Sequence, residues 1–113
     1  MVKLLLNKNP KMDNILLNAA NAPDRGELTK AGHALQKHGE RLNSLFPKPQ
    51  GNPHTISEQA LAIVEDILEN PKRSVTVRYH ARFGKITEIY APNGQGIRYD
   101  SKNNFIGFIE KGN

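Results

Sequence analysis

The chain has 113 residues, 37% of them hydrophobic, which is enough for one modest core and too little for two stable domains. It contains no cysteine, which excludes disulfides, thiol catalysis and cysteine-based zinc sites. The formal net charge of +5 favours a polyanionic partner. Residues 71–113 carry eight basic against three acidic side chains, so the positive charge is concentrated in the C-terminal part.

Residues 1–27 are rich in asparagine and end in a turn signal that includes Pro23 and Gly26. The run Leu4–Leu6 is too short for a signal peptide or a membrane span. One short stretch, Met12–Asn21, is a helical candidate. We expect residues 1–27 to be a linker with marginal structure, and residues 28–113 to be the folded domain.

Two helices are predicted next. The first covers residues 28–38, with Thr29 as its N-cap and Gly39 just after its end. Residues 46–53 contain three prolines and one glycine, which predicts a loop without regular structure. The second helix covers residues 54–70, capped by Thr55 or Ser57, and its apolar residues recur at helical spacing.

From Ser74 onward the pattern becomes that of strands, predicted over residues 74–82, 85–91, 95–99 and 104–109. The connections are short enough for an antiparallel meander. Helices followed by four such strands predict an α+β domain, in which the second helix covers one face of the sheet.

The first predicted strand alternates between two kinds of side chain. Arg78, His80 and Arg82 should share one face, and the apolar side chains should be buried on the other; these are Val75, Val77, Tyr79 and Phe83. Two guanidinium groups around an imidazole are typical of a surface for phosphate chemistry. The alternative is a solvated sheet face that happens to be basic.

The histidines do not have metal-ligand spacing, because His33 and His38 are five positions apart on a helix. No carboxylate cluster of a two-metal nuclease and no phosphate-binding glycine loop occur in the sequence. What remains is acid/base chemistry with cations. RNA suits it, because its 2′-hydroxyl is a built-in nucleophile and the protein need only move protons and stabilise the phosphorane.

Such a site could combine His80, Arg78 and Arg82 with Arg98 from a later strand. The second acid or base would come from His38 or Lys37 near the end of the first helix.

Each of these residues also has a structural interpretation. His38 could simply complement the dipole at the end of its helix. His33 could be a packing or surface residue, and His54 could flank the second helix. Arg78 and Arg82 could pair with Glu88 across the hairpin, a surface interaction of small energy.

The order of short motifs along residues 28–110 resembles the C-terminal toxin domains of bacterial polymorphic toxins, in particular the contact-dependent growth inhibition (CdiA-type) ribonucleases. The resemblance rests on the following segments: Leu28–Gly32, Leu35–Gly39, Phe46–Pro49 with Gly51–Pro53, Ile67–Leu68 with Asn70–Pro71, His80–Gly84, Ala91–Gly94 with Gly96, and Phe105–Phe108. These domains belong to the barnase, EndoU, colicin D and RelE superfamily, whose fold also has helices before a four-stranded antiparallel sheet.

The resemblance implies a toxin that cleaves RNA, often tRNA, in the cytoplasm of a target bacterium, with no metal and no other cofactor. It also implies a cognate immunity protein, which we expect to be acidic, and leaves open the need for a host activating factor. Residues 1–27 would then be a remnant of the variable segment that assists passage into the target cell.

The expected catalytic residues are His38, His80 and Arg82, and the expected substrate-binding residues are Lys37, Arg78 and Arg98. His38 comes from a Lys-His-Gly motif and His80 with Arg82 from a His-x-Arg motif. Which histidine is acid and which is base stays open. The alternatives are a metal-dependent DNase toxin and a non-catalytic basic module that binds nucleic acid or an acidic protein.

Overall fold

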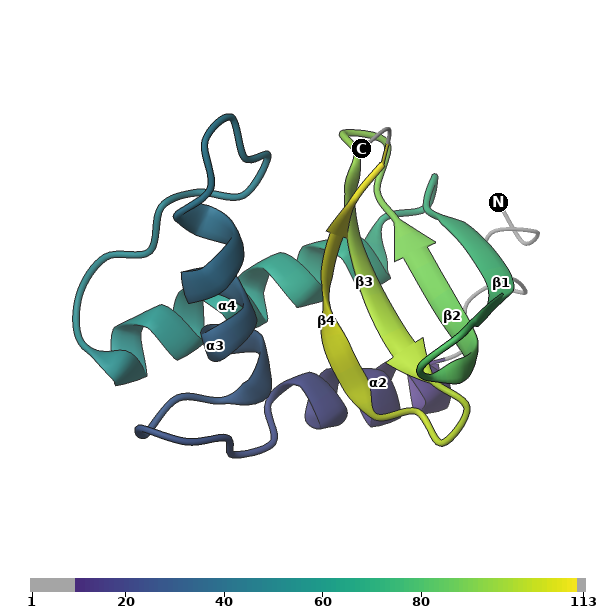
Figure 1. Ribbon diagram of the computed structural model, residues 1–113, viewed down its shortest axis with the longest axis horizontal. Coiled ribbons are helices and arrows are strands. Elements are labelled where there is room, and N and C mark those ends of the chain that lie inside the picture. Colours follow the sequence, from purple (N-terminus) through teal and green to yellow (C-terminus); the bar gives the residue numbers. More distant parts are fainter. Residues whose placement is uncertain (1–9, 112–113) are drawn as a thin grey trace.

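The computed structural model describes residues 10–111 (Figure 1). Helices α2 (Pro10–Ala20), α3 (Lys30–Gly39) and α4 (Pro53–Glu69) precede strands β1 (Ser74–His80), β2 (Gly84–Tyr90), β3 (Gln95–Asp100) and β4 (Phe105–Glu110). The strands form one antiparallel meander in the order β1-β2-β3-β4, so the predicted α+β class is confirmed. Within the described residues, no helix combines the length and apolar character needed to cross a membrane.

The helices cover one face of the sheet. Ile89 of β2, Ile97 of β3 and Phe108 of β4 are register partners, so they share a face, and all three are buried in the core. Leu35 of α3 and Val64 of α4 belong to the same core. In Figure 1, α4 passes behind β3 and β4 while α3 lies beside β4. None of the helices between residues 10 and 111 lies on the opposite sheet face, which is toward the viewer.

Helix α2 belongs to this core. Leu16 and Ala20 are buried, and the buried hydroxyl of Tyr99 donates a hydrogen bond of 2.9 Å to the carbonyl oxygen of Leu16. Residues 10–20 therefore have a fixed place in the fold, whereas the sequence indicated marginal structure. The run Leu4–Leu6 lies outside the described residues, and the boundary at residue 27 stays a prediction.

The N-terminal caps of α3 and α4 are both polar side chains. Thr29 caps α3 as predicted, since its hydroxyl accepts a hydrogen bond of 3.0 Å from the Gly32 N–H. Helix α4 begins earlier than predicted, at Pro53. Its cap is Asn52, whose side chain accepts from the Thr55 N–H, so the predicted cap at Thr55 or Ser57 is wrong. Proline suits the first turn because no intrahelical hydrogen bond needs its N–H.

The predicted burial of the apolar face of β1 is wrong. Val75, Val77 and Tyr79 are 58%, 53% and 84% exposed. Strand β1 is at the edge of the sheet and contacts β2, whereas the helices pack against β2, β3 and β4. Alternation indicated a strand correctly, but burial also requires a covering layer, and the layer formed by α2, α3 and α4 ends before β1.

The place of α2 in the core can be tested with neighbouring substitutions. Leu16→Ala should lower the free energy of unfolding by about 2–4 kcal/mol, because it leaves a cavity in the core. Ile15 is 46% exposed, and Ile15→Ala should cost less than about 1 kcal/mol. Urea unfolding followed by circular dichroism measures both. Equal losses would contradict a packed α2.

Candidate active site

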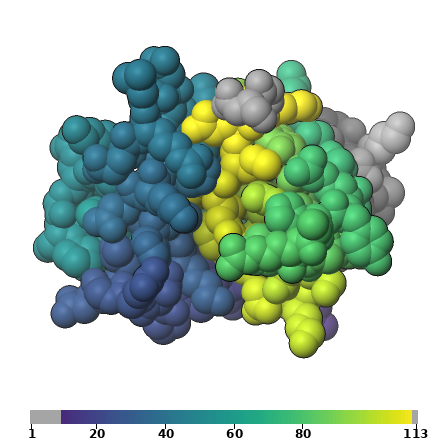
Figure 2. Space-filling view, in the orientation of Figure 1, coloured from purple at the N-terminus to yellow at the C-terminus, as the bar shows by residue number. Residues whose placement is uncertain are grey.

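Two adjoining clefts lie where α3 and its following loop meet the sheet. The larger, here called the α3 cleft, has a volume of about 760 Å³, and the smaller, the loop cleft, about 590 Å³. His38, Arg41, Arg98 and Phe108 line both, so these side chains form a common wall. In Figure 2 the yellow surface of β4 lies between the blue surface of α3 with its loop and the green surface of the β1–β2 hairpin.

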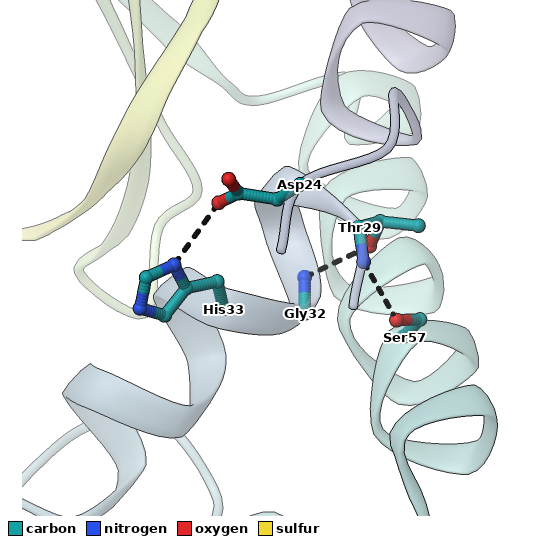
Figure 3. A network of polar contacts seen from close by, with 5 residues as sticks. All are labelled: Asp24, Thr29, Gly32, His33 and Ser57. Carbon is teal, nitrogen blue, oxygen red and sulfur yellow. Dashed lines mark hydrogen bonds and ion pairs between the residues drawn. The ribbon is translucent and has the colours of Figure 1, made fainter. Parts of the chain in front are cut away.

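The position of α3 is set by a close crossing with α4. The Thr29 N–H donates a hydrogen bond of 3.0 Å to Ser57 Oγ, and a Cβ added at Gly32 would lie only 2.6 Å from the same oxygen (Figure 3). A glycine is therefore required for the two helices to approach this closely. The crossing holds α3 against the sheet, and α3 in turn carries His33, Lys37 and His38.

His38 is a buried member of the common wall. Its ring makes edge-on contacts with Phe46 and Phe108, with centroid distances of 5.5 and 6.2 Å. Burial, and next the positive charge of Arg41, hold the pKa of His38 below its usual value of 6.5. The ring is therefore neutral at pH 7.

The tautomer of His38 follows from its neighbour. Arg41 Nη1 lies 3.3 Å from His38 Nδ1, and a guanidinium can only donate. Nδ1 is then the acceptor, and the neutral ring carries its proton on Nε2. In this state His38 offers a hydrogen-bond donor to a ligand, rather than a lone pair at Nε2.

The α3 cleft is strongly cationic. Its lining includes one carboxylate, that of Asp24, and five cationic side chains: Lys30, Lys37, Arg41, Arg82 and Arg98. A concave surface with this charge raises the local concentration of polyanions and suits a phosphodiester.

Four of the six predicted site residues line the α3 cleft: Lys37, His38, Arg82 and Arg98. Arg78 and His80 do not line either cleft. Strand β1 ends at His80, so Arg82 is in the following turn and the predicted strand to residue 82 is too long. His80 orders this turn, because its Nδ1 accepts a hydrogen bond of 3.1 Å from the Arg82 N–H and its ring packs 5.1 Å from that of Phe83.

Arg78 and Arg98 share a buried carboxylate on the helix-free face of the sheet. Their Nε atoms lie 3.4 and 3.5 Å from Glu88 Oε2, and the Tyr90 hydroxyl donates to Glu88 Oε1 at 3.2 Å. The alternative pairing of Glu88 is thus confirmed for Arg78. Its second partner is Arg98, whereas the sequence had suggested Arg82. Register explains this, since Glu88 and Arg98 are direct cross-strand partners.

Two features of the cleft were not predicted from the sequence. Arg41 follows the end of α3, where three-residue spacing still brings it to His38, so a signal existed. Asp24 and His33 are nine positions apart and form a hydrogen bond of 3.0 Å across the turn that precedes α3, for which the sequence holds no signal. His33 and His38 also line the same cleft, although the spacing indicated different helix faces.

Among residues 10–111, no group of three or more histidine, aspartate or glutamate side chains could hold a metal ion. Most of the charged groups that line the clefts are guanidinium and ammonium groups, together with imidazoles and the carboxylates of Asp24 and Glu110. A basic cleft around a buried histidine, on an α+β domain, fits a protein of the nuclease class.

Comparisons with known proteins agree with this class. Residues 17–110 match the family described as the CdiA C-terminal tRNase toxin domain. A solved structure, the toxic C-terminal tip of CdiA from Pseudomonas aeruginosa in complex with an immune protein, is similar with a TM-score of 0.70 and 30% sequence identity. The match covers 82% of this chain and 99% of that chain. No curated protein matches. The chain belongs to the family of CdiA C-terminal tRNase toxin domains, and it is an antibacterial toxin of the endoribonuclease class.

The buried carboxylate gives a prediction about stability. Glu88→Gln should lower the free energy of unfolding by about 3 kcal/mol, because the largely buried Arg98 guanidinium would lose its counter-charge. Glu65→Gln, on the exposed side of α4, serves as the control and should cost less than about 0.5 kcal/mol. Denaturant unfolding measures both, and an equally small loss at Glu88 would contradict the pairing.

The lowered pKa of His38 gives a prediction about pH. As the pH falls below 6.5, the unfolded chain binds a proton on His38 that the folded chain resists, so stability should decrease there and level off above that pH. In His38→Gln this part of the pH dependence should be missing. Unfolding curves of both proteins on either side of pH 6.5 measure it, and identical pH dependence would contradict the shift.

Proposed function

We propose that this domain cleaves tRNA without a metal ion, in the α3 cleft, by attack of a 2′-hydroxyl on the adjacent phosphate. The observation that carries the proposal is the gathering of five cationic side chains around a buried, neutral histidine in one cleft. Membership of a tRNase family supports RNA as the substrate, and favours it over the two alternatives of a DNase and a non-catalytic module.

In this reaction the 2′-oxygen bonds to phosphorus and the bond from phosphorus to the 5′-oxygen breaks. The products are a 2′,3′-cyclic phosphate and a 5′-hydroxyl. Negative charge builds up on the phosphoryl oxygens, and donors placed around them stabilise it. His38 donates its Nε2–H to one of these oxygens, and Arg82 and Arg98 supply charge beside it. Lys37 holds the neighbouring backbone phosphate.

The two remaining predicted residues, Arg78 and His80, lie outside the two clefts. Arg78, 56% exposed at its side chain, contacts the RNA backbone farther along the edge of the sheet. Proton exchange between His80 and His38 stays a prediction, and His80 has a second possible role in ordering the turn that carries Arg82. A substitution of His80 tests both of these roles while His38 stays in place.

The cationic α3 cleft also indicates which partners this domain binds. The related Pseudomonas aeruginosa toxin tip forms a complex with an immune protein. For this chain we propose an immunity protein whose carboxylates cover the cationic α3 cleft, and action in the cytoplasm of the target cell, where tRNA is available. Whether a host factor activates the toxin is decided by comparing purified tRNA with tRNA in cell extract.

The direct test incubates the pure domain with total tRNA in the presence of EDTA. We expect discrete fragments that end in 2′,3′-cyclic phosphate. Intact tRNA at near-stoichiometric protein, with or without extract, would overturn the proposal. Cleavage of plasmid DNA only with added Mg²⁺ would favour the DNase, and salt-sensitive binding without any product would favour the non-catalytic module.

Histidine substitutions locate the chemistry within the fold. His38→Ala should reduce cleavage by at least about 100-fold, because the donor to the phosphoryl oxygen is lost. His54→Ala is the matched control: His54 is exposed, lies outside both clefts, and pairs with Glu58 one turn along its own helix. It should cleave at the wild-type rate. Equal rates for both variants would mean that the α3 cleft is not the active site.

A further inference from the structure

We propose that His33 is the general base of the α3 cleft and that Asp24 is the residue that positions it. This inference rests on the proposed function, since it assigns a role within the same cleavage reaction. It replaces neither His38 nor the cationic side chains, but supplies the proton acceptor that the tautomer of His38 leaves missing.

The Asp24–His33 pair has the geometry of an oriented base. His33 Nδ1 lies 3.0 Å from Asp24 Oδ2. A carboxylate can only accept, so Nδ1 donates, and the neutral ring then has its lone pair on Nε2. Figure 3 shows this second nitrogen on the side of the ring away from Asp24. The same arrangement of carboxylate, imidazole and free Nε2 activates hydroxyl nucleophiles in other hydrolases.

The two histidines of the cleft are therefore in complementary states. Arg41 makes Nδ1 of His38 an acceptor, which leaves Nε2–H as a donor. Asp24 makes Nδ1 of His33 a donor, which leaves Nε2 as an acceptor. Both line the α3 cleft, so a phosphodiester bound there can meet a donor and an acceptor together.

The pair is both anchored and accessible. The Asp24 N–H donates to the Leu28 carbonyl oxygen at 2.8 Å, and Pro23 forms a β-bridge with Thr29, the cap of α3. The side chains of His33 and Asp24 are 35% and 34% exposed, which leaves the ring open to a ligand. The hydrogen bond from His33 also holds the pKa of Asp24 below its usual value, so the carboxylate stays ionised.

His33 Nε2 takes the proton of the 2′-hydroxyl as the bond between the 2′-oxygen and phosphorus forms. The bond from phosphorus to the 5′-oxygen breaks, and that oxygen takes a proton from water. The His33 imidazolium later returns its proton to the solvent, so the enzyme is regenerated.

The test compares four variants of the whole domain on tRNA. His33→Gln should lower kcat by about 100-fold or more while KM changes less than about 3-fold, because the loss is confined to the transition state. Asp24→Asn should lower kcat at least about 10-fold through the wrong tautomer. The matched controls, His54→Gln and Glu58→Gln, remove the exposed histidine–carboxylate pair of α4 and should leave both constants unchanged.

A purely structural role is separated by chemical rescue. Imidazole added to His33→Ala should restore a large part of the lost rate, and should do nothing for His38→Gln. Absence of rescue in a folded His33→Ala protein, or wild-type kcat in His33→Gln, would overturn the inference while the proposed function stands. A wild-type protein that leaves tRNA intact would overturn both.

Discussion

The close crossing of α3 and α4 is the constraint on which the rest of the site depends. Thr29 caps the N-terminus of α3 with its hydroxyl and donates its N–H to Ser57 on α4. Gly32 leaves room for that contact. Three functional side chains, His33, Lys37 and His38, are on this one helix. A rigid helix fixes their relative positions, so anchoring its first turn to the core places the whole group against the sheet.

The helix-free face of the sheet supplies the other wall. Glu88, buried between two arginines, offsets part of their charge and gives Arg98 a fixed position at the junction of the two clefts. Without the carboxylate, Arg98 would be a largely buried and uncompensated charge. The same pairing that stabilises the sheet therefore holds a cation where a phosphate would bind.

Much of this architecture could be predicted. The meander, the cap at Thr29 and the two main helices have local causes, which are periodicity, capping side chains and turn residues. The same local reasoning went wrong at β1 and α2, where burial depends on neighbours that are distant in sequence. Val77 has the pattern of a core residue and is exposed because α2, α3 and α4 pack on the other strands and not on the edge strand.

The sequence by itself determined the class of fold, the excess of positive charge and a set of candidates of which Lys37, His38, Arg82 and Arg98 line one cleft. Only the tertiary structure decided which distant groups form hydrogen bonds and ion pairs with one another. Asp24 meets His33 through an irregular turn in which Gly26 and Glu27 both have positive φ, and Arg98 meets Glu88 through strand register. Turn geometry and register are set by the packing of the whole chain, so the partners of His33 and Arg98 follow from the fold.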